Sequence, residues 1–146
     1  MEPQKTIPIT VETIVHAPVE KVWSYWTEPK HITKWCYASD DWHAPYAEND
    51  LETGGKFRTT MAARDGSAGF DFEGVYTKIE KQKTIEYKIG DGRKVIINFS
   101  DLGTGTRVVE SFEAESENSY EQQKGGWQSI LDNFKKYTES KELNRS

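Results

Sequence analysis

Glu110 is the residue whose type and position point most directly to chemistry inside the protein. It lies between Val108 and Phe112 in a stretch of alternating apolar residues, so strand parity places all three on one inward face. A buried carboxylate without a partner is costly, and its pKa rises. Glu110 is therefore a candidate anchor for a ligand or a candidate general acid. The alternatives are that Arg58, Arg107 or a tyrosine hydroxyl pairs with it, or that a β-bulge turns it outward.

No other residues have the spacing of a catalytic or metal-binding motif. The histidines, His16, His31 and His43, show no HxxxH pattern, and the single cysteine, Cys36, has no CxxC partner. The sequence contains no GxSxG motif, and its glycine-containing turns match neither a phosphate-binding loop nor a dinucleotide fingerprint. We therefore predict no metal, no cofactor and no catalytic residue defined by a motif.

A long amphipathic helix is predicted over residues 118–140. Asn118 or Ser119 can cap its start, and Glu121 and Gln122 lie in the first turn, where a capping-box partner would be. About 20 helical residues span roughly 30 Å, so the helix needs a large apolar partner, and a curved sheet upstream is big enough to supply one. Its apolar stripe consists of Tyr120, Trp127, Ile130, Leu131, Phe134 and Tyr137.

Two glycines, Gly125 and Gly126, interrupt this helix, where each costs about 1 kcal/mol relative to alanine. One interpretation is a kink, or close packing against a neighbouring element. The alternative is functional, because two missing side chains would leave room for a ligand beside Trp127.

The rest of the chain predicts an antiparallel sheet with two short helices. Residues 7–16 form a strand, a helix starts at Pro18 and stops at Pro29, and a second helix covers 30–36. Residues 37–53 predict a long loop, either without regular structure or with one short edge strand near Ala47. Loops of this length often serve as lids or entrances. Gly74 indicates a bulge or a bend. Five further strands cover residues 56–63, 69–81, 84–89, 93–100 and 106–114. Short turns between strands and segregated helices indicate an α+β fold.

Length and charge limit the classes of function. The chain has 146 residues, which predicts a single domain over 1–146. Its net charge of −5 disfavours a nucleic-acid partner. It has no apolar run long enough for a signal peptide or a membrane span. We therefore expect a cytoplasmic protein with no membrane insertion, either a monomer or a homodimer.

Five motifs follow one another along the chain. They are Ala17-Pro18-x4-Trp23, Thr27-x-Pro29-x2-Ile32-x2-Trp35, Phe72-x-Gly74-x-Tyr76-x2-Ile79, Thr106-Arg107-Val108 through Phe112-x2-Glu115, and Gly126-Trp127-Gln128-x-Ile130-Leu131-x-Asn133-Phe134. Together they resemble the SRPBCC or START-like superfamily, and most closely the bacterial relatives of the Hsp90 ATPase activator C-terminal domain. The resemblance covers about residues 8–138, the expected core of the domain.

The resemblance implies a helix-grip fold, in which a curved antiparallel sheet wraps around the long C-terminal helix and two short helices follow the first strand. It also implies a mostly apolar cavity between sheet and helix. Each inward apolar residue taken alone is explained by close packing in a core, but the set fits the lining of such a cavity. The candidate ligand-binding residues are Trp35, Phe57, Met61, Phe72, Tyr76, Tyr87, Ile97, Glu110, Phe112, Trp127, Ile130, Leu131 and Phe134.

Three hypotheses of function follow. The first is a binding protein that holds a small hydrophobic molecule, similar to a lipid, a polyketide or an aromatic compound. The second is an enzyme, such as a cyclase, hydrolase or isomerase, acting on such a molecule with Glu110 and Tyr76 as its acid–base candidates. The third is an interaction domain associated with a chaperone, which would need an exposed apolar patch. We favour the binding protein, because it needs only the fold and the apolar lining.

Overall fold

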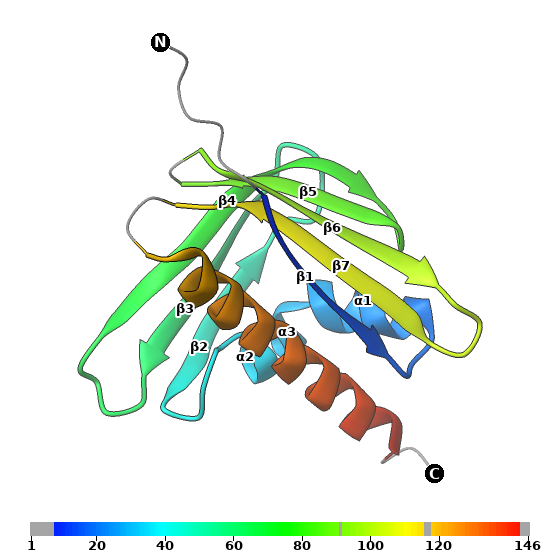
Figure 1. The fold of residues 1–146 in the computed structure, drawn as a ribbon, viewed down its shortest axis with the longest axis horizontal. Helices are drawn as coiled ribbons and strands as arrows, with labels where there is room; N and C mark the ends of the chain where they lie inside the picture. Colours follow the sequence, from blue (N-terminus) through cyan, green and yellow to red (C-terminus); the bar gives the residue numbers. More distant parts are fainter. Residues whose placement is uncertain (1–7, 91, 116–117, 144–146) are drawn as a thin grey trace.

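The computed structural model describes residues 8–90, 92–115 and 118–143 and shows a curved sheet with three helices in this part of the chain (Figure 1). The predicted α+β helix-grip fold is confirmed. Residue 7, at the start of the first predicted strand, lies outside the described residues. The elements in chain order are β1 (Pro8–Val15), α1 (Val19–Thr27), α2 (Pro29–Trp35), β2 (Trp42–Asn49), β3 (Lys56–Ala63), β4 (Gly69–Glu80), β5 (Thr84–Ile89), β6 (Lys94–Asp101), β7 (Thr106–Glu113) and α3 (Tyr120–Leu143).

The strands form one antiparallel sheet in the order β1-β7-β6-β5-β4-β3-β2. From β2 to β7 each strand pairs with the next strand along the chain, as a meander does, and β1 pairs with β7 at the far edge. The sheet curves, and α3 runs across its concave side while packing against β1 (Figure 1). The helices α1 and α2 lie at one end of this concave side, and α2 packs against β2.

Alternating apolar residues give the sheet its two different faces. In β6, the side chains of Val95, Ile97 and Phe99 are buried, and the residues between them are more exposed. This period of two puts apolar side chains on the concave face and polar ones on the convex face. The concave face is therefore the surface that the helices must cover.

The helix α3 begins with the predicted capping box. The Ser119 hydroxyl accepts a hydrogen bond from the backbone N–H of Gln122 at 3.1 Å, and the Gln122 side chain accepts one from the backbone N–H of Ser119 at 3.0 Å. Leu131 and Phe134 are fully buried, as expected for the apolar stripe. Tyr120, which the helical spacing assigned to the same stripe, is 42% exposed because it lies in the first turn, before the helix reaches the core.

The segment over residues 37–53, predicted as a long loop with the option of a short edge strand near Ala47, contains the edge strand β2. The strand is longer than predicted, and because it belongs to the sheet, its residues do not form a loop that could act as a lid. The register of β2 against β3 shifts between His43 and Tyr46, around Pro45. This irregularity breaks the period of two that would reveal a strand in the sequence. Proline is tolerated because β2 is an edge strand, where one row of backbone groups has no partner strand.

Gly74 allows the close approach of a side chain and a backbone carbonyl group, and the bulge that its place in the sequence had suggested does not lie at this residue. A Cβ atom at this position would lie 2.9 Å from ring atoms of Phe57 and 2.5 Å from the carbonyl oxygen of Lys88. The irregularity of β4 lies further on, where its register against β5 shifts between Tyr76 and Lys78. Glycine at position 74 therefore lets the ring of Phe57 approach the backbone of β4 closely.

The two glycines of α3 behave differently from Gly74. A Cβ atom at Gly125 or Gly126 would meet nothing within 4 Å, so the expectation of close packing is wrong, and both residues lie within one continuous helix. We predict that Gly126→Ala raises the free energy of unfolding by about 1 kcal/mol, because alanine loses less backbone entropy in a helix. Urea denaturation followed by circular dichroism measures this change.

The matched control for that substitution is Gly74→Ala, which introduces the same methyl group. It should lower the free energy of unfolding, because the methyl group collides with Phe57 and with the carbonyl oxygen of Lys88. Equal effects of the two substitutions, or a loss of stability in Gly126→Ala, would contradict this account of the helix.

Candidate functional site

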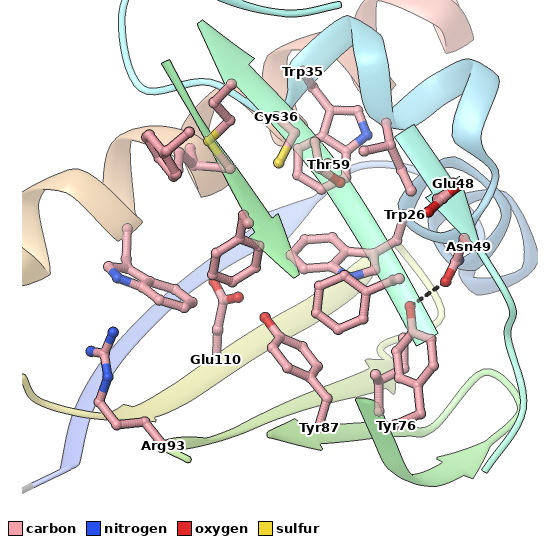
Figure 2. A pocket seen from close by; sticks show the side chains of 18 residues that line it. Trp26, Trp35, Cys36, Glu48, Asn49, Thr59, Tyr76, Tyr87, Arg93 and Glu110 are labelled. Atoms are coloured by element: carbon pink, nitrogen blue, oxygen red, sulfur yellow. Dashed lines mark hydrogen bonds between the residues drawn. The ribbon is translucent and has the colours of Figure 1, made fainter. Parts of the chain in front are cut away.

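A cavity of about 280 Å³ lies between the concave face of the sheet and the helices (Figure 2). Its walls come from all three described helices and from strands on both halves of the sheet. Phe70, which is 52% exposed, and the exposed Glu48 both line it, so the cavity reaches the surface beside β2 and β4. The cavity is therefore open to a molecule from solvent.

Most of the residues that the sequence predicted as lining do lie on the cavity wall. Their role in binding a ligand remains a prediction. The predicted residues on the wall are Trp35, Phe57, Met61, Phe72, Tyr76, Tyr87, Glu110, Trp127 and Ile130.

The other predicted lining residues are buried in the core next to the cavity instead. Phe112 is covered by Trp127, whose ring stacks on it with centroids 3.9 Å apart. Phe134 packs edge-on against Trp26 and Trp35, at 4.8 Å from each. Residues of this second group are Ile97, Phe112, Leu131 and Phe134.

Several lining residues were missed by the sequence analysis. Ile85 and Thr59 could have been found, because they alternate with Tyr87 and with Phe57 on the same strand faces. Glu48 and Asn49 lie in the irregular strand β2, where no period marks their direction. The complete set of missed residues is Trp26, Ile32, Cys36, Glu48, Asn49, Thr59, Phe70, Ile85 and Arg93.

Aromatic rings make up much of the wall and pack against one another. Phe57 lies 4.7 Å from Tyr87 and 5.1 Å from Tyr76, measured between ring centroids. Phe72 bridges the two sides of the cavity, at 6.2 Å from Tyr87 and 5.9 Å from Trp127 on α3. Offset and edge-on contacts of this kind add to the stability of each ring's burial. The rings are therefore fixed walls around an apolar space.

Glu110 lies on the concave face in the middle of the sheet. Its register partners are Val11 on β1 and Ile97 on β6, and Ile97 in turn lies opposite Ile85 on β5. Neighbours in such a row point to the same face, and only 5% of the Glu110 surface is exposed. The parity argument from the sequence thus gave the correct direction for this side chain.

No partner compensates the burial of Glu110 within the part of the chain that the structure describes, where its carboxyl makes no hydrogen bond or ion pair. Burial raises the pKa of Glu110 to about 8. The arginines proposed as partners lie elsewhere: Arg58 pairs with Glu48 at 3.5 Å, and Arg107 pairs with Glu12 at 3.7 Å. Glu110 is therefore a largely protonated acid at neutral pH, facing an apolar cavity.

Two tyrosines of the wall differ in the environment of their hydroxyl groups. The Tyr76 hydroxyl donates a hydrogen bond to Oδ1 of Asn49 at 2.5 Å. The Tyr87 hydroxyl makes no hydrogen bond within the described residues. Burial, and then the nearby Glu110 carboxyl, raise the pKa of Tyr87 well above its ordinary value. Burial also raises the pKa of the Cys36 thiol to about 12, again with a contribution from Glu110.

Two other kinds of site lack support in the described ranges. Across residues 8–90, 92–115 and 118–143, no three His, Cys, Asp or Glu side chains gather closely enough to hold a metal ion. None of the helices in these ranges has both the length and the apolar character needed to cross a membrane.

One family model matches most of the chain. The model of the family described as activator of Hsp90 ATPase homolog 1-like protein matches residues 16–139. No curated protein matches the chain.

Solved structures from several bacteria share this fold. The solution structure of an AHSA1-like protein from Aeromonas hydrophila is 42% identical, with a TM-score of 0.89 over 96% of this chain and 97% of that one. A protein from Cytophaga hutchinsonii is 56% identical, with a TM-score of 0.79 over 94% and 95% of the two chains. A protein from Nitrosomonas europaea, at 19% identity and a TM-score of 0.77 over 94% and 97%, shows the fold alone.

The burial of Glu110 predicts how stability depends on pH. Between pH 4.5 and about 8 the unfolded chain releases the Glu110 proton while the folded protein keeps it, so the free energy of unfolding should fall as pH rises. Glu110→Gln removes this loss. At neutral pH the variant should be more stable than the wild type by a few kcal/mol, at most roughly 4. Urea denaturation at a series of pH values measures both effects.

The control is Glu73→Gln on β4, where the side chain is exposed. That variant should follow the wild-type curve at every pH, because its carboxylate is solvated in both states. Parallel curves for Glu110→Gln and the wild type would show that the Glu110 carboxyl is not buried as a neutral acid.

Proposed function

The chain belongs to the activator of Hsp90 ATPase homolog 1-like family, and we propose that it is a binding protein for a small hydrophobic molecule. The observation that carries this proposal is the cavity of about 280 Å³ with aromatic walls and an opening to solvent. Ligand pockets are typically apolar with a few placed polar groups, and their volumes start at roughly 300 Å³. The cavity has this character and lies near the lower limit of that size.

A packing defect is a poor explanation for a space of this size. Protein interiors are close-packed, and voids larger than a water molecule are few. Lining residues such as Phe72 and Trp127 lose contacts on the side that faces the void. A bound apolar molecule would restore these contacts. Its binding would therefore explain why large side chains surround a cavity.

The volume favours a compact ligand. An extended lipid chain would need a longer tunnel, whereas one or two fused rings suit a space enclosed by Phe57, Phe72 and Tyr87. Flat rings can also make the offset and edge-on contacts that the wall residues already make with one another. We therefore favour an aromatic or polycyclic molecule within the hydrophobic class.

Catalysis is the second candidate function, because one observation specifically supports it. The pKa of Glu110, raised to about 8 by burial, lies close to neutral pH, where a general acid or base works best. If the bound molecule is converted, Glu110→Gln should abolish turnover while the molecule still binds. A protein that only binds should release the molecule unchanged from both the wild type and the variant.

A cavity-filling substitution tests the binding function. Thr59 is buried, lines the cavity and has a small side chain. Thr59→Phe should weaken the binding of the neutral dye N-phenyl-1-naphthylamine by more than about tenfold, because the new ring occupies the space that the dye needs. Titration of the dye, followed by its fluorescence and by quenching of the tryptophans, measures the dissociation constant.

Thr60→Phe is the matched control, because it adds the same ring to the other face of β3, where the Thr60 hydroxyl donates to Asp71 at 2.7 Å. Dye binding to this variant should equal binding to the wild type. Native mass spectrometry of the freshly purified wild type should in addition reveal a small apolar passenger that Thr59→Phe lacks. Equal dye binding by the two variants would place the dye outside the cavity and defeat the proposal.

A further inference from the structure

The geometry points to a ligand that carries a carbonyl oxygen, held between the hydroxyl group of Tyr87 and the carboxyl group of Glu110. This inference rests on the proposed binding function and specifies the chemical group that the ligand presents. It starts from two buried polar side chains that line one cavity and have no hydrogen-bonding partner among the described residues. Buried polar side chains usually have a hydrogen-bonding partner, so polar groups that face a cavity without one are available to a bound molecule.

Tyr87 and Glu110 lie on the two strands that flank β6. Tyr87 on β5 pairs with Val95 on β6, while Glu110 on β7 pairs with Ile97 on β6. Val95 and Ile97 are fully buried aliphatic residues of β6, the strand between β5 and β7. The strands β5 and β7 are two strand spacings apart, roughly 9.6 Å. The side chains of Tyr87 and Glu110 are longer than those of Val95 and Ile97, so they lie on either side of a gap above β6.

Figure 2 shows the hydroxyl group of Tyr87 and the carboxyl group of Glu110 pointing toward the same part of the cavity. They do not bond to each other, although the charge of Glu110 is close enough to affect the ionisation of Tyr87. The Tyr76 hydroxyl provides an internal contrast, because its donor is already used by Asn49. Of the two wall tyrosines, Tyr87 is thus the one whose hydroxyl is left for a ligand among the described residues.

Both groups act as donors at neutral pH. The phenol of Tyr87 stays protonated, and the pKa of Glu110 is about 8, so its carboxyl carries a proton. A carbonyl oxygen has two lone pairs and can accept one hydrogen bond from each group. A phenol and a protonated carboxyl group that share an apolar site are a known arrangement for holding a ligand oxygen.

An amine ligand is the competing chemistry, since it would pair with an ionised Glu110. Burial opposes that state, because both charges would lose their hydration. The other titratable or charged groups lining the cavity are Cys36 at the end of α2, Glu48 on β2, Tyr76 on β4 and Arg93 before β6. Glu48 is exposed and already pairs with Arg58, so the described part of the cavity wall supplies no second buried carboxylate to hold a cation.

A matched pair of probes tests the inference. The ketone 2-acetylnaphthalene and the hydrocarbon 2-ethylnaphthalene have similar shapes and differ at the carbonyl oxygen. The wild type should bind the ketone more tightly, and Tyr87→Phe should reduce this preference by about tenfold, the usual effect of one lost hydrogen bond at a buried site. Tyr76→Phe is the control and should leave the preference unchanged. Tryptophan quenching gives each dissociation constant, and the ratio for the two probes cancels general packing effects.

The Glu110 half of the site is tested by pH. In the wild type the preference for the ketone should decline above about pH 8, where the donor proton of Glu110 is lost. Glu110→Gln keeps an N–H donor at the same place. This variant should therefore retain the preference and show no decline with pH.

The possible outcomes separate this inference from the function on which it rests. If both probes bind but Tyr87→Phe leaves the preference unchanged, the cavity binds apolar molecules and the carbonyl site is wrong. If 2-naphthylmethylamine binds more tightly than the ketone and Glu110→Gln abolishes its binding, the amine chemistry replaces the carbonyl. If neither naphthalene probe binds, both the inference and the proposed function are overturned.

Discussion

The aromatic contacts that seat α3 on one side of the sheet are the constraint on which the rest of the structure depends. Trp127 stacks on Phe112 of β7, and Phe134 packs against Trp26 and Trp35 of the two short helices. A helix is about 10 Å wide, whereas a sheet of this size spans roughly 30 Å. Fixed near β1, α3 leaves much of the concave face for other groups to cover. Large rings and α2 cover that part incompletely, and the remaining space is the cavity.

The cavity explains why a carboxyl group is found at position 110. Alternation in β7 puts position 110 on the concave face, where an apolar residue would satisfy every local rule of packing. A carboxyl group at this place lowers stability at neutral pH, because burial opposes its ionisation. Sequences are generally consistent across local and global levels, and departures gather at functional sites. Glu110 departs from the apolar pattern of the concave face and faces the cavity rather than a structural partner, which supports a role in binding.

The fold was largely predictable from the sequence, whereas the cavity wall was predictable only in part. Period-two alternation survives in β3, β6 and β7, so strands and the direction of Glu110 follow from parity. It fails in β2, where the register shift around Pro45 hides the extent of the strand and the lining role of Asn49. Parity also cannot separate wall from core: Phe112 and Glu110 share a face, but Trp127 stacks on Phe112 while Glu110 lines the cavity. That distinction depends on where α3 lies, which is a property of the assembled fold.

Tyr76 and Tyr87 show most clearly why contacts add something that residue type does not. They are register partners on adjacent strands, point to the same face and line the same cavity. The irregular strand β2 brings Asn49 to the hydroxyl of Tyr76, and Asn49 is itself held by donating to the carbonyl oxygen of Thr27. Nothing equivalent reaches the hydroxyl of Tyr87 in the described residues. The polar groups of Tyr76 and Asn49 are thus used in internal hydrogen bonds, whereas those of Tyr87 and Glu110 remain for a bound molecule. This asymmetry would orient a bound molecule, with its oxygen toward β7 and its apolar body toward the rings of β3 and β4.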